Sequence, residues 1–548
     1  MKLNYKRVIF VGFAFFLISA FWQAYDTIVP KILTDKFGMS QAVSGAIMAL
    51  DNVFALFLLP IFGAFSDKIN SKHGRRTPFI VIGTVIAAVL LVTLSIPDAN
   101  QKTALGTLSV ADDPTTIEVN EYTKSLQTIW DANPEMRPAE KPTDGKSLGE
   151  ILKSLNPFAS APTKPLQDYE EMNYEKFMSI AMENTEGEIT EDYTKWVVPA
   201  RQAYAAQKTS AAPSHLIMFM FLLFLVLVAM GTFRSPAVAL MPDVTIKPLR
   251  SKANAVINLM GTAGGILVLL LGIVLGTGKA KNALMSYTTF FAIVAGIMMV
   301  GLAIFLWKVR EVKWAAEMQE DAERLGLNQT VEAADNTTET RKLSRAEKTS
   351  LILILASVVF WFMGYNAVTS KYSVYASTVL DVDYNTTLLI AQGAAIAAYL
   401  PVGMLSSKFG RKKMILAGVA ILCGSFFGAS FLSASSPALV KNLLMPTLFA
   451  AAGIGWATIN VNSYPMVVEL SRGSNVGKYT GIYYTASMSA QIVTPILSGA
   501  LMDASYYTLF PYAAIFVALA FLTMFFVRHG DAKPEAKSVM LDAMGGDD

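Results

Sequence analysis

The chain has 548 residues, of which 53% are hydrophobic and 16% are charged, and its formal net charge is +3. Soluble domains carry roughly 25% charged residues, so this composition argues against an ordinary soluble domain and favours a chain dissolved in lipid. The small net charge gives no support to a nucleic-acid partner. A single cysteine, Cys423, excludes a disulfide within the chain and argues against a thiolate metal site.

Hydrophobic residues are grouped in runs of about 20, the length that an α-helix needs to cross a bilayer. Twelve such runs predict an all-α polytopic membrane protein. The first run is too long for the hydrophobic region of a signal peptide and is interpreted as retained. In chain order the runs lie near residues 9–30, 42–65, 78–96, 215–241, 254–275, 286–307, 350–369, 386–405, 414–434, 442–462, 482–502 and 509–527.

Lysine and arginine clusters precede run one and follow runs two, four and eight, so they share one side of the membrane if every run spans it. The positive-inside rule makes that side the cytoplasm. We therefore expect a multi-pass protein of the cell (inner or plasma) membrane with both termini in the cytoplasm.

Two long polar stretches interrupt the runs. Residues 97–213 carry 19 acidic and 11 basic side chains. The order of the runs places them outside the cytoplasm, as a small helical cap or a partly disordered insertion between helices 3 and 4. The predicted segments are 1–96 with helices 1–3, the insertion 97–213, 214–307 with helices 4–6, a charged cytoplasmic helical linker at 308–347, 348–530 with helices 7–12, and a cytoplasmic tail at 531–548.

Short sequence matches indicate a duplicated six-helix unit. The pattern GAFSD…GRR that starts at Gly63 resembles GMLSS…GRK that starts at Gly403, at an offset of 340 residues. Pro242 after run four corresponds to Pro465 after run ten, at an offset of 223 residues. The difference, 117 residues, equals the length of 97–213, so we expect this stretch to be inserted in one copy only. Duplicated halves around a central site are a common plan for secondary transporters.

Residues 63–79 read GAFSDKINSKHGRRTPF. The spacing of the acid, the glycine and the Pro-Phe pair resembles the cytoplasmic signature loop of the major facilitator superfamily, in the form of the sucrose–proton symporter and glycoside-pentoside-hexuronide branch. Two residues depart from that pattern: Thr77, where the branch usually has a third arginine, and Ser407, which replaces the acid in the second copy. The resemblance covers all twelve runs and implies two six-helix bundles that rock around a central cavity, with coupling to an ion gradient.

Charged residues in and near the signature loops are candidates for a cytoplasmic gate, because acids at helix ends and arginines in a tight turn pair when that side closes. The glycine allows two helices to approach closely. The alternative is that these charges only set the topology. The candidate gate residues are Asp67, Gly74, Arg75, Arg76 and Asp243 in the first half, with Arg411, Glu469 and Arg472 as counterparts in the second.

Two acids lie inside apolar runs, where an unpaired charge is costly and usually functional. Asp51 is about nine residues into run two, roughly 14 Å deep, and is the predicted proton-coupling residue. Asp26 in run one is predicted to be shallower, with Gln23 three residues before it, and to be a second titrating site or a solute hydrogen-bond acceptor. The alternative is a static ion pair of either acid with Arg234 or Lys371.

Aromatic side chains with neighbouring amides suit a carbohydrate, since aromatic faces pack against the C–H surfaces of a sugar ring while amides bind its hydroxyl groups. Runs one, seven and ten carry such clusters. Tryptophan and tyrosine also anchor helices at the membrane interface, which is the alternative for each residue. The candidate solute-binding residues are Trp22, Tyr25, Trp361, Tyr365, Asn366, Trp456 and Asn460.

These patterns favour a secondary active transporter that takes up a sugar or glycoside with protons, Na⁺ being the alternative coupling ion. A proton-driven efflux antiporter for organic compounds and a transporter-like membrane sensor are the other hypotheses. An enzyme is not expected, because the sequence has no Gly-x-Ser-x-Gly, His-Glu-x-x-His or zinc-like cluster. We expect no cofactor, the lipid bilayer and a small polar solute as partners, and a monomer, because each two-half chain could enclose its own pathway.

Overall fold

The computed structural model describes residues 3–69, 71–106, 127–128, 130–131, 174–182, 190, 192–246, 249–279, 282–324, 344–469 and 476–529. Within these residues ten segments are long and apolar enough to cross a membrane. Two further long helices, α14 and α17, are not among these ten. The long helices are α1 Tyr5–Lys31, α2 Gln41–Lys68, α3 Thr77–Leu105, α8 Ser214–Asp243, α9 Arg250–Leu275, α10 Thr288–Lys308, α13 Arg345–Tyr375, α14 Tyr384–Phe409, α15 Arg411–Ala429, α16 Ala438–Glu469, α17 Val476–Ala504 and α18 Leu509–Phe525.

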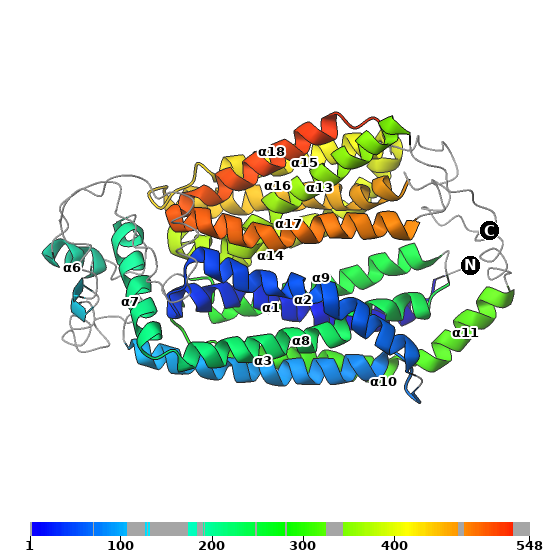
Figure 1. The fold of residues 1–548 in the computed structure, drawn as a ribbon, viewed down its shortest axis with the longest axis horizontal. Helices are drawn as coiled ribbons and strands as arrows, with labels where there is room; N and C mark the ends of the chain where they lie inside the picture. Colours follow the sequence, from blue (N-terminus) through cyan, green and yellow to red (C-terminus); the bar gives the residue numbers. More distant parts are fainter. Residues whose placement is uncertain are drawn as a thin grey trace.

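The long helices form two bundles that lie side by side (Figure 1). The N-terminal bundle contains α1, α2, α3, α8, α9 and α10, and α13 to α18 make up the C-terminal bundle. Each bundle has its own buried apolar cluster, one around Phe21 and Phe233 and the other around Trp361 and Phe510. The predicted all-α class with two bundles is therefore confirmed.

Shorter helices mark the two ends of the molecule (Figure 1). At one end, called the cap end here, lie α6 (Tyr174–Met182), the π-helical turn η3 (Tyr193–Val197) and α7 (Val198–Ala211). These elements belong to the predicted insertion after α3. The opposite end, called the terminal end, holds the first turn of α1 and α11 (Glu311–Arg324) from the predicted linker. Most of that linker beyond 324 and the predicted tail at 531–548 lie outside the described residues.

Three helices continue past their predicted ends at the cap end. The π-helical turn η1 (Ile32–Lys36) extends α1, and η6 (Ala376–Leu380) extends α13. Helix α3 runs to Leu105, beyond the predicted end at 96. Polar and charged residues in these extensions lower the hydropathy of the sequence, so the predicted runs end before them. In the folded protein such residues have hydrogen-bond partners. Lys36 donates to Asp98 at 2.5 Å and to the Met285 carbonyl at 2.6 Å.

Burial along α2 shows where the two bundles meet. The side chains of residues 41–49 are nearly all buried, whereas Phe57 and Phe65 farther along the helix are 63% and 58% exposed. The buried part of α2 contacts α17 of the C-terminal bundle, since a side chain on Gly45 would overlap the carbonyl of Pro495. The bundles are therefore tightly packed at the cap end.

Candidate transport site

The two membrane acids lie at the same level of the N-terminal bundle. Helix α1 with its extension η1 ends at Lys36, ten residues after Asp26. Helix α2 begins at Gln41, ten residues before Asp51. At 1.5 Å per residue both lie roughly 15 Å from that end of the bundle. The prediction that Asp26 is shallower was wrong, because the helix continues through η1 instead of ending at Pro30.

Arg234 of α8 is a cation that interacts with both acids. Its guanidinium acts electrostatically on Asp26 and Asp51, and it lies over the ring of Trp22 at 5.4 Å from the centroid. The carboxylate of Asp51 also accepts a hydrogen bond from Asn52 Nδ2 at 2.7 Å. The side chain of Asp26 is exposed, and it interacts electrostatically with charges on two other helices, Asp51 on α2 and Arg234 on α8.

Aromatic side chains of the C-terminal bundle form a flat stack. The rings of Tyr365 on α13 and Trp456 on α16 are parallel within 2° with centroids 3.6 Å apart. Phe362 meets the same indole edge-on at 5.3 Å. Both stacked residues are only partly buried. The stack joins two of the candidate residues that the sequence placed on different runs.

The other candidates divide by burial. Asn366 and Asn460 are partly buried, and Asn366 Nδ2 has no hydrogen-bond partner among the described residues. Trp361 and Tyr25 are fully buried in the cores of their bundles. The prediction that these two side chains contact solute does not fit this conformation, because helical spacing alone did not distinguish the core face of each helix from the face toward the other bundle.

An amide pair connects the bundles close to the acids. Gln392 Nε2 of α14 donates to Gln23 Oε1 of α1 at 2.7 Å, and both side chains are partly buried. Gly265 of α9 lies beside both amides, and a Cβ at this position would be 3.4 Å from the side-chain oxygen of each glutamine. A residue with a longer side chain would therefore extend into the space of the pair. Gln392 was not among the sequence candidates, since a single glutamine in an apolar run does not reveal which helix it faces.

Two lysines cross between the bundles at the cap end. Lys31 Nζ donates to Ser377 Oγ at 2.6 Å, and Lys371 Nζ donates to the Gln41 carbonyl at 2.5 Å. The lysines are 340 residues apart, which is the offset of the internal repeat. Asp503 at the end of α17 completes this region by accepting the backbone N–H groups of Gln41 and Ala42 at 2.5 and 2.9 Å. Lys371 therefore belongs to this interface and does not pair with Asp26 or Asp51.

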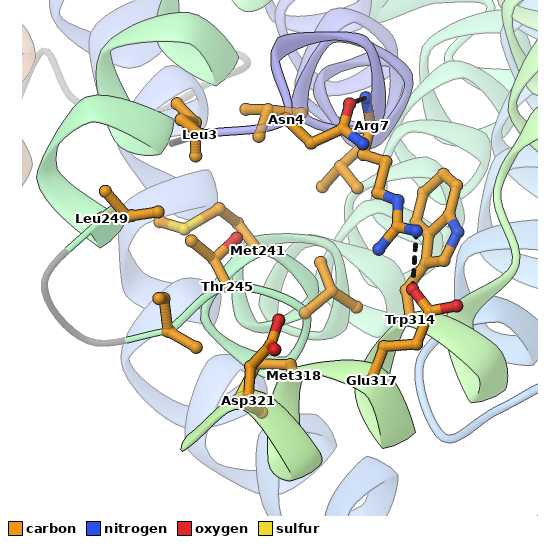
Figure 2. A pocket seen from close by; sticks show the side chains of 14 residues that line it. Leu3, Asn4, Arg7, Met241, Thr245, Leu249, Trp314, Glu317, Met318 and Asp321 are labelled. Carbon is orange, nitrogen blue, oxygen red and sulfur yellow. Dashed lines mark hydrogen bonds and ion pairs between the residues drawn. The ribbon is translucent and has the colours of Figure 1, made fainter. Parts of the chain in front are cut away.

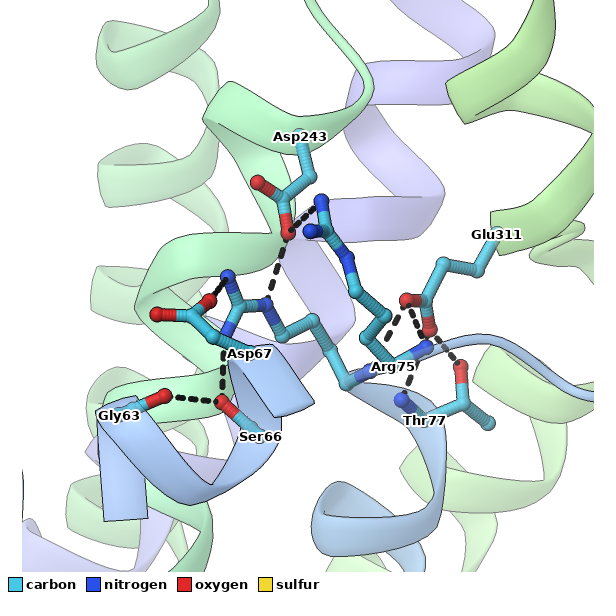
Figure 3. Close-up of polar contacts among 8 residues, drawn as sticks. Gly63, Ser66, Asp67, Arg75, Thr77, Asp243 and Glu311 are labelled. Atoms are coloured by element: carbon cyan, nitrogen blue, oxygen red, sulfur yellow. Dashed lines mark hydrogen bonds and ion pairs between the residues drawn. The ribbon is translucent and has the colours of Figure 1, made fainter. Parts of the chain in front are cut away.

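The predicted gate residues of the first half form one network (Figure 3). Arg76 binds Asp67 through Nη2 at 2.5 Å and Asp243 through Nε at 2.7 Å, and it also donates to Ser66. Arg75 lies 3.5 Å from the same Asp243 oxygen. Burial opposes the charge of Arg76, but its bonds to Asp243 and Asp67 outweigh this and raise its pKa. The network joins the ends of α2 and α8 to the start of α3.

Glu311 is a further partner that the sequence analysis missed. Glu311 is the first residue of α11, and its carboxylate accepts four hydrogen bonds (Figure 3). Three come from the backbone N–H groups of Arg75, Arg76 and Thr77 at 2.6, 2.9 and 2.8 Å, and one comes from the Thr77 hydroxyl at 2.7 Å. Unpaired N–H groups at a helix start need such acceptors. Gly74, at φ +109°, passes so close to this carboxylate that a Cβ there would overlap it. Thr77, a departure from the family pattern, thus has a structural role.

The second copy of the loop makes different contacts. Arg411 begins α15, and the neighbouring Lys412 donates to the carbonyls of Phe525 and Val527 at 2.9 and 2.6 Å, at the end of α18. Glu469 is the last residue of α16, and its side chain is outside the described part of the structure. Arg472 also lies outside the described residues. The second half of the gate therefore stays a prediction, because two of its three residues lie outside the described side chains.

A small cavity of ≈ 120 Å³ lies at the terminal end, between the first turn of α1, the end of α8 and α11 (Figure 2). Arg7 projects into it, paired with Glu317 at 2.6 Å and lying 5.4 Å from the ring centroid of Trp314. Its lining comes from the N-terminal bundle and α11, so it is separate from the space between the bundles. The paired charges attach α11 to α1.

Sequence comparisons identify relatives of this chain. The Major Facilitator Superfamily model matches residues 203–445 and 385–541, and the MFS/sugar transport protein model matches residues 10–109. A putative glycoside/cation symporter of Escherichia coli is 28% identical over 78 residues, or 14% of this chain and 17% of that protein. A sucrose transport protein of Arabidopsis thaliana is 34% identical over 67 residues, or 12% and 11%. The chain thus matches only about a sixth or less of the length of these two relatives.

Solved structures share the fold over nearly the whole chain. The inward-open form of the xylose transporter XylE from E. coli superposes with a TM-score of 0.55 at 13% identity, covering 99% of this chain and 100% of that one. A D-xylose–proton symporter gives 0.51 at 14% identity, covering 97% and 99%. At such identities the likeness concerns the fold. Together with the family match, it shows that the chain belongs to the major facilitator superfamily, a family of transport proteins and not of enzymes.

Proposed function

We propose that this protein takes up a sugar or glycoside together with protons by alternating access. Membership of the superfamily supports a transport role, and the partial relatives named as a glycoside/cation symporter and a sucrose transport protein support the solute class. The named relatives match over short segments only, so the proposal depends on the residues of the site.

The observation that carries the proposal is that two carboxylates at one level of the N-terminal bundle interact with the same arginine. Arg234 can balance a single negative charge, while Asp26 and Asp51 supply two. An uncompensated charge within a membrane-spanning bundle is costly, so uptake of one proton by the pair stabilises the site. Because the acids interact, the proton belongs to the pair and not to one residue. This arrangement suits proton coupling better than a static ion pair.

Aromatic and amide side chains of the two bundles suit a polyhydroxylated solute. The stacked rings of Tyr365 and Trp456 offer an apolar face, and the amides of Gln23 and Gln392 offer hydrogen-bond donors and acceptors. Trp22 precedes Gln23 on α1, and its ring lies beneath the guanidinium of Arg234, which interacts with both acids. The solute would bind between the bundles, where closure at either end determines access.

The cap end is the extracytoplasmic side in this proposal. The lysine and arginine clusters of the signature loops lie at the terminal end, which the positive-inside rule assigns to the cytoplasm. The tight packing at the cap end then corresponds to a conformation closed to the outside. We propose a monomer in the plasma membrane, since each chain contains both bundles.

The test is uptake of radiolabelled sucrose, maltose and small glycosides into proteoliposomes with an imposed inward proton gradient. The wild-type protein should accumulate at least one solute above equilibrium. Asp26→Asn and Asp51→Asn should lose pH-driven accumulation but retain solute counterflow, which needs no net proton movement. Asp321→Asn, on α11 with a side chain that is 50% exposed, is the matched control and should behave as wild type. The proposal is rejected if correctly inserted protein transports no sugar, or if both membrane variants accumulate solute normally.

A further inference from the structure

The inserted helix α7 is fixed to the N-terminal bundle. It lies against the turn between α1 and α2, where Gly38 has φ +65° and a Cβ would overlap the backbone nitrogen of Ala206 and the carbonyl of Gln202. Gln101 of α3 donates to Thr209 Oγ1 of α7 at 3.0 Å. With backbone this close, α7 moves with its own bundle.

The same helix reaches the C-terminal bundle through the side chain of Gln202. Gln202 Nε2 donates to the hydroxyl of Tyr506 at 3.1 Å. Tyr506 opens the short helix η7 (Tyr506–Thr508), directly after α17. Gln41 Nε2 approaches the same hydroxyl at 3.3 Å. Tyr506 is thus bound by the insertion and by α2 together, beside the Asp503 contacts that join α17 to α2.

We propose that Gln202 is a gating residue: the inserted helix acts as a clasp that holds the two bundles together at the cap end. When the bundles separate there, α7 stays with α3 while Tyr506 moves with α17, so this contact exists in only one of the two states. A contact made in one state alone shifts the equilibrium toward that state. The lysine contacts at this interface follow the internal repeat, but the insertion occurs in one copy, so the clasp is an addition to the duplicated plan.

The clasp predicts faster opening of the cap end when the contact is removed. Ser377→Cys in a Cys423→Ala background provides a single reporter thiol, because Ser377 is 2% exposed and lies between the bundles. A membrane-impermeant maleimide is applied from the cap side of reconstituted protein. Gln202→Leu should raise the labelling rate about fivefold, the effect of losing one hydrogen bond in a single state. Tyr506→Phe, which removes only the hydroxyl, should act in the same direction.

Ser210→Ala is the matched control, because it removes one hydrogen bond of the same helix, from the Ser210 hydroxyl to the Ala206 carbonyl at 2.8 Å, that joins α7 to neither bundle. Its labelling rate should equal that of the parent. Parental labelling of both Gln202→Leu and Tyr506→Phe would overturn the proposal, as would an equal acceleration by Ser210→Ala. The inference rests on alternating access, but the assay needs no solute or proton gradient, so it can fail while sugar uptake is observed, or succeed while the proposed solute class is wrong.

Discussion

At the start of α11, the Glu311 carboxylate receives four hydrogen bonds from the loop that begins α3. All four partners are donors, so a carboxylate, which only accepts, fits this position better than an amide. The glutamate binds the backbone of the same Arg76 whose side chain holds Asp67 and Asp243, and so connects the linker to that network. Glu311 therefore holds the signature loop in one conformation.

Replacing this acceptor tests the assignment. Glu311→Gln presents an NH₂ group to backbone donors, so we expect the free energy of unfolding to fall by about 2 kcal/mol. Thermal unfolding of the purified protein in detergent measures the change. Glu317→Gln, which loses a partly exposed pair with Arg7, should cost less than about 1 kcal/mol. Equal destabilisation by the two variants would contradict a special role for Glu311.

Site residues within the apolar runs could be predicted from the sequence where they are charged. Asp26, Asp51 and Arg234 stood out because charges in apolar runs are costly, and the structure brings them within electrostatic reach of one another. Gln392 and Glu311 were not predictable. An amide is tolerated in many membrane positions, and an acid in a charged linker resembles any solvated residue until its partners are known.

At the scale of helices, hydropathy located every long element but misplaced ends at the cap side. Lys36 and Asp98 belong to helical segments there because they are paired and buried, and Asp98 also accepts the N–H of Tyr287 at 3.2 Å. The ammonium of Lys36 lies 4.7 Å from the centroid of the Tyr287 ring. Sequence hydropathy assigns each charge a cost and does not register a partner 62 residues away.

The Lys36–Asp98 pair should be a main determinant of how η1, α3 and α10 pack together. Lys36→Met leaves the Asp98 carboxylate buried without its partner, so we expect a loss of about 3–5 kcal/mol. The double variant Lys36→Met/Asp98→Leu removes both charges and should be more stable than either single variant. Thermal unfolding of the four proteins completes the cycle. Additive losses would show that the pair does not interact as described.

At the scale of the whole molecule, the internal repeat relates the two bundles but not all their contacts. The lysines Lys31 and Lys371 obey the 340-residue offset and each crosses to the other bundle. The signature loops do not remain equivalent: the first binds Glu311, while Lys412 of the second binds carbonyls at the end of α18. Sequence similarity predicted the duplication, but the divergent partners lie far away in the chain.

The packing difference along the bundle interface predicts unequal access. On α17, Ser498 near the cap end is 1% exposed and Tyr484 toward the terminal end is 52% exposed. In a Cys423→Ala background, a cysteine at position 484 should react with a small polar maleimide at least about tenfold faster than one at position 498 in detergent-solubilised protein. Similar rates would mean that the cap end is not the closed end.

Coupling between solute and proton is the central claim, and proton movement driven by solute tests it most directly. Proteoliposomes containing a trapped pH indicator, with no imposed pH gradient, receive an inward gradient of each candidate sugar. We predict internal acidification with a transported sugar, absent in Asp26→Asn and Asp51→Asn. Sugar entry without acidification in the wild-type protein would contradict proton symport through the shared carboxylates.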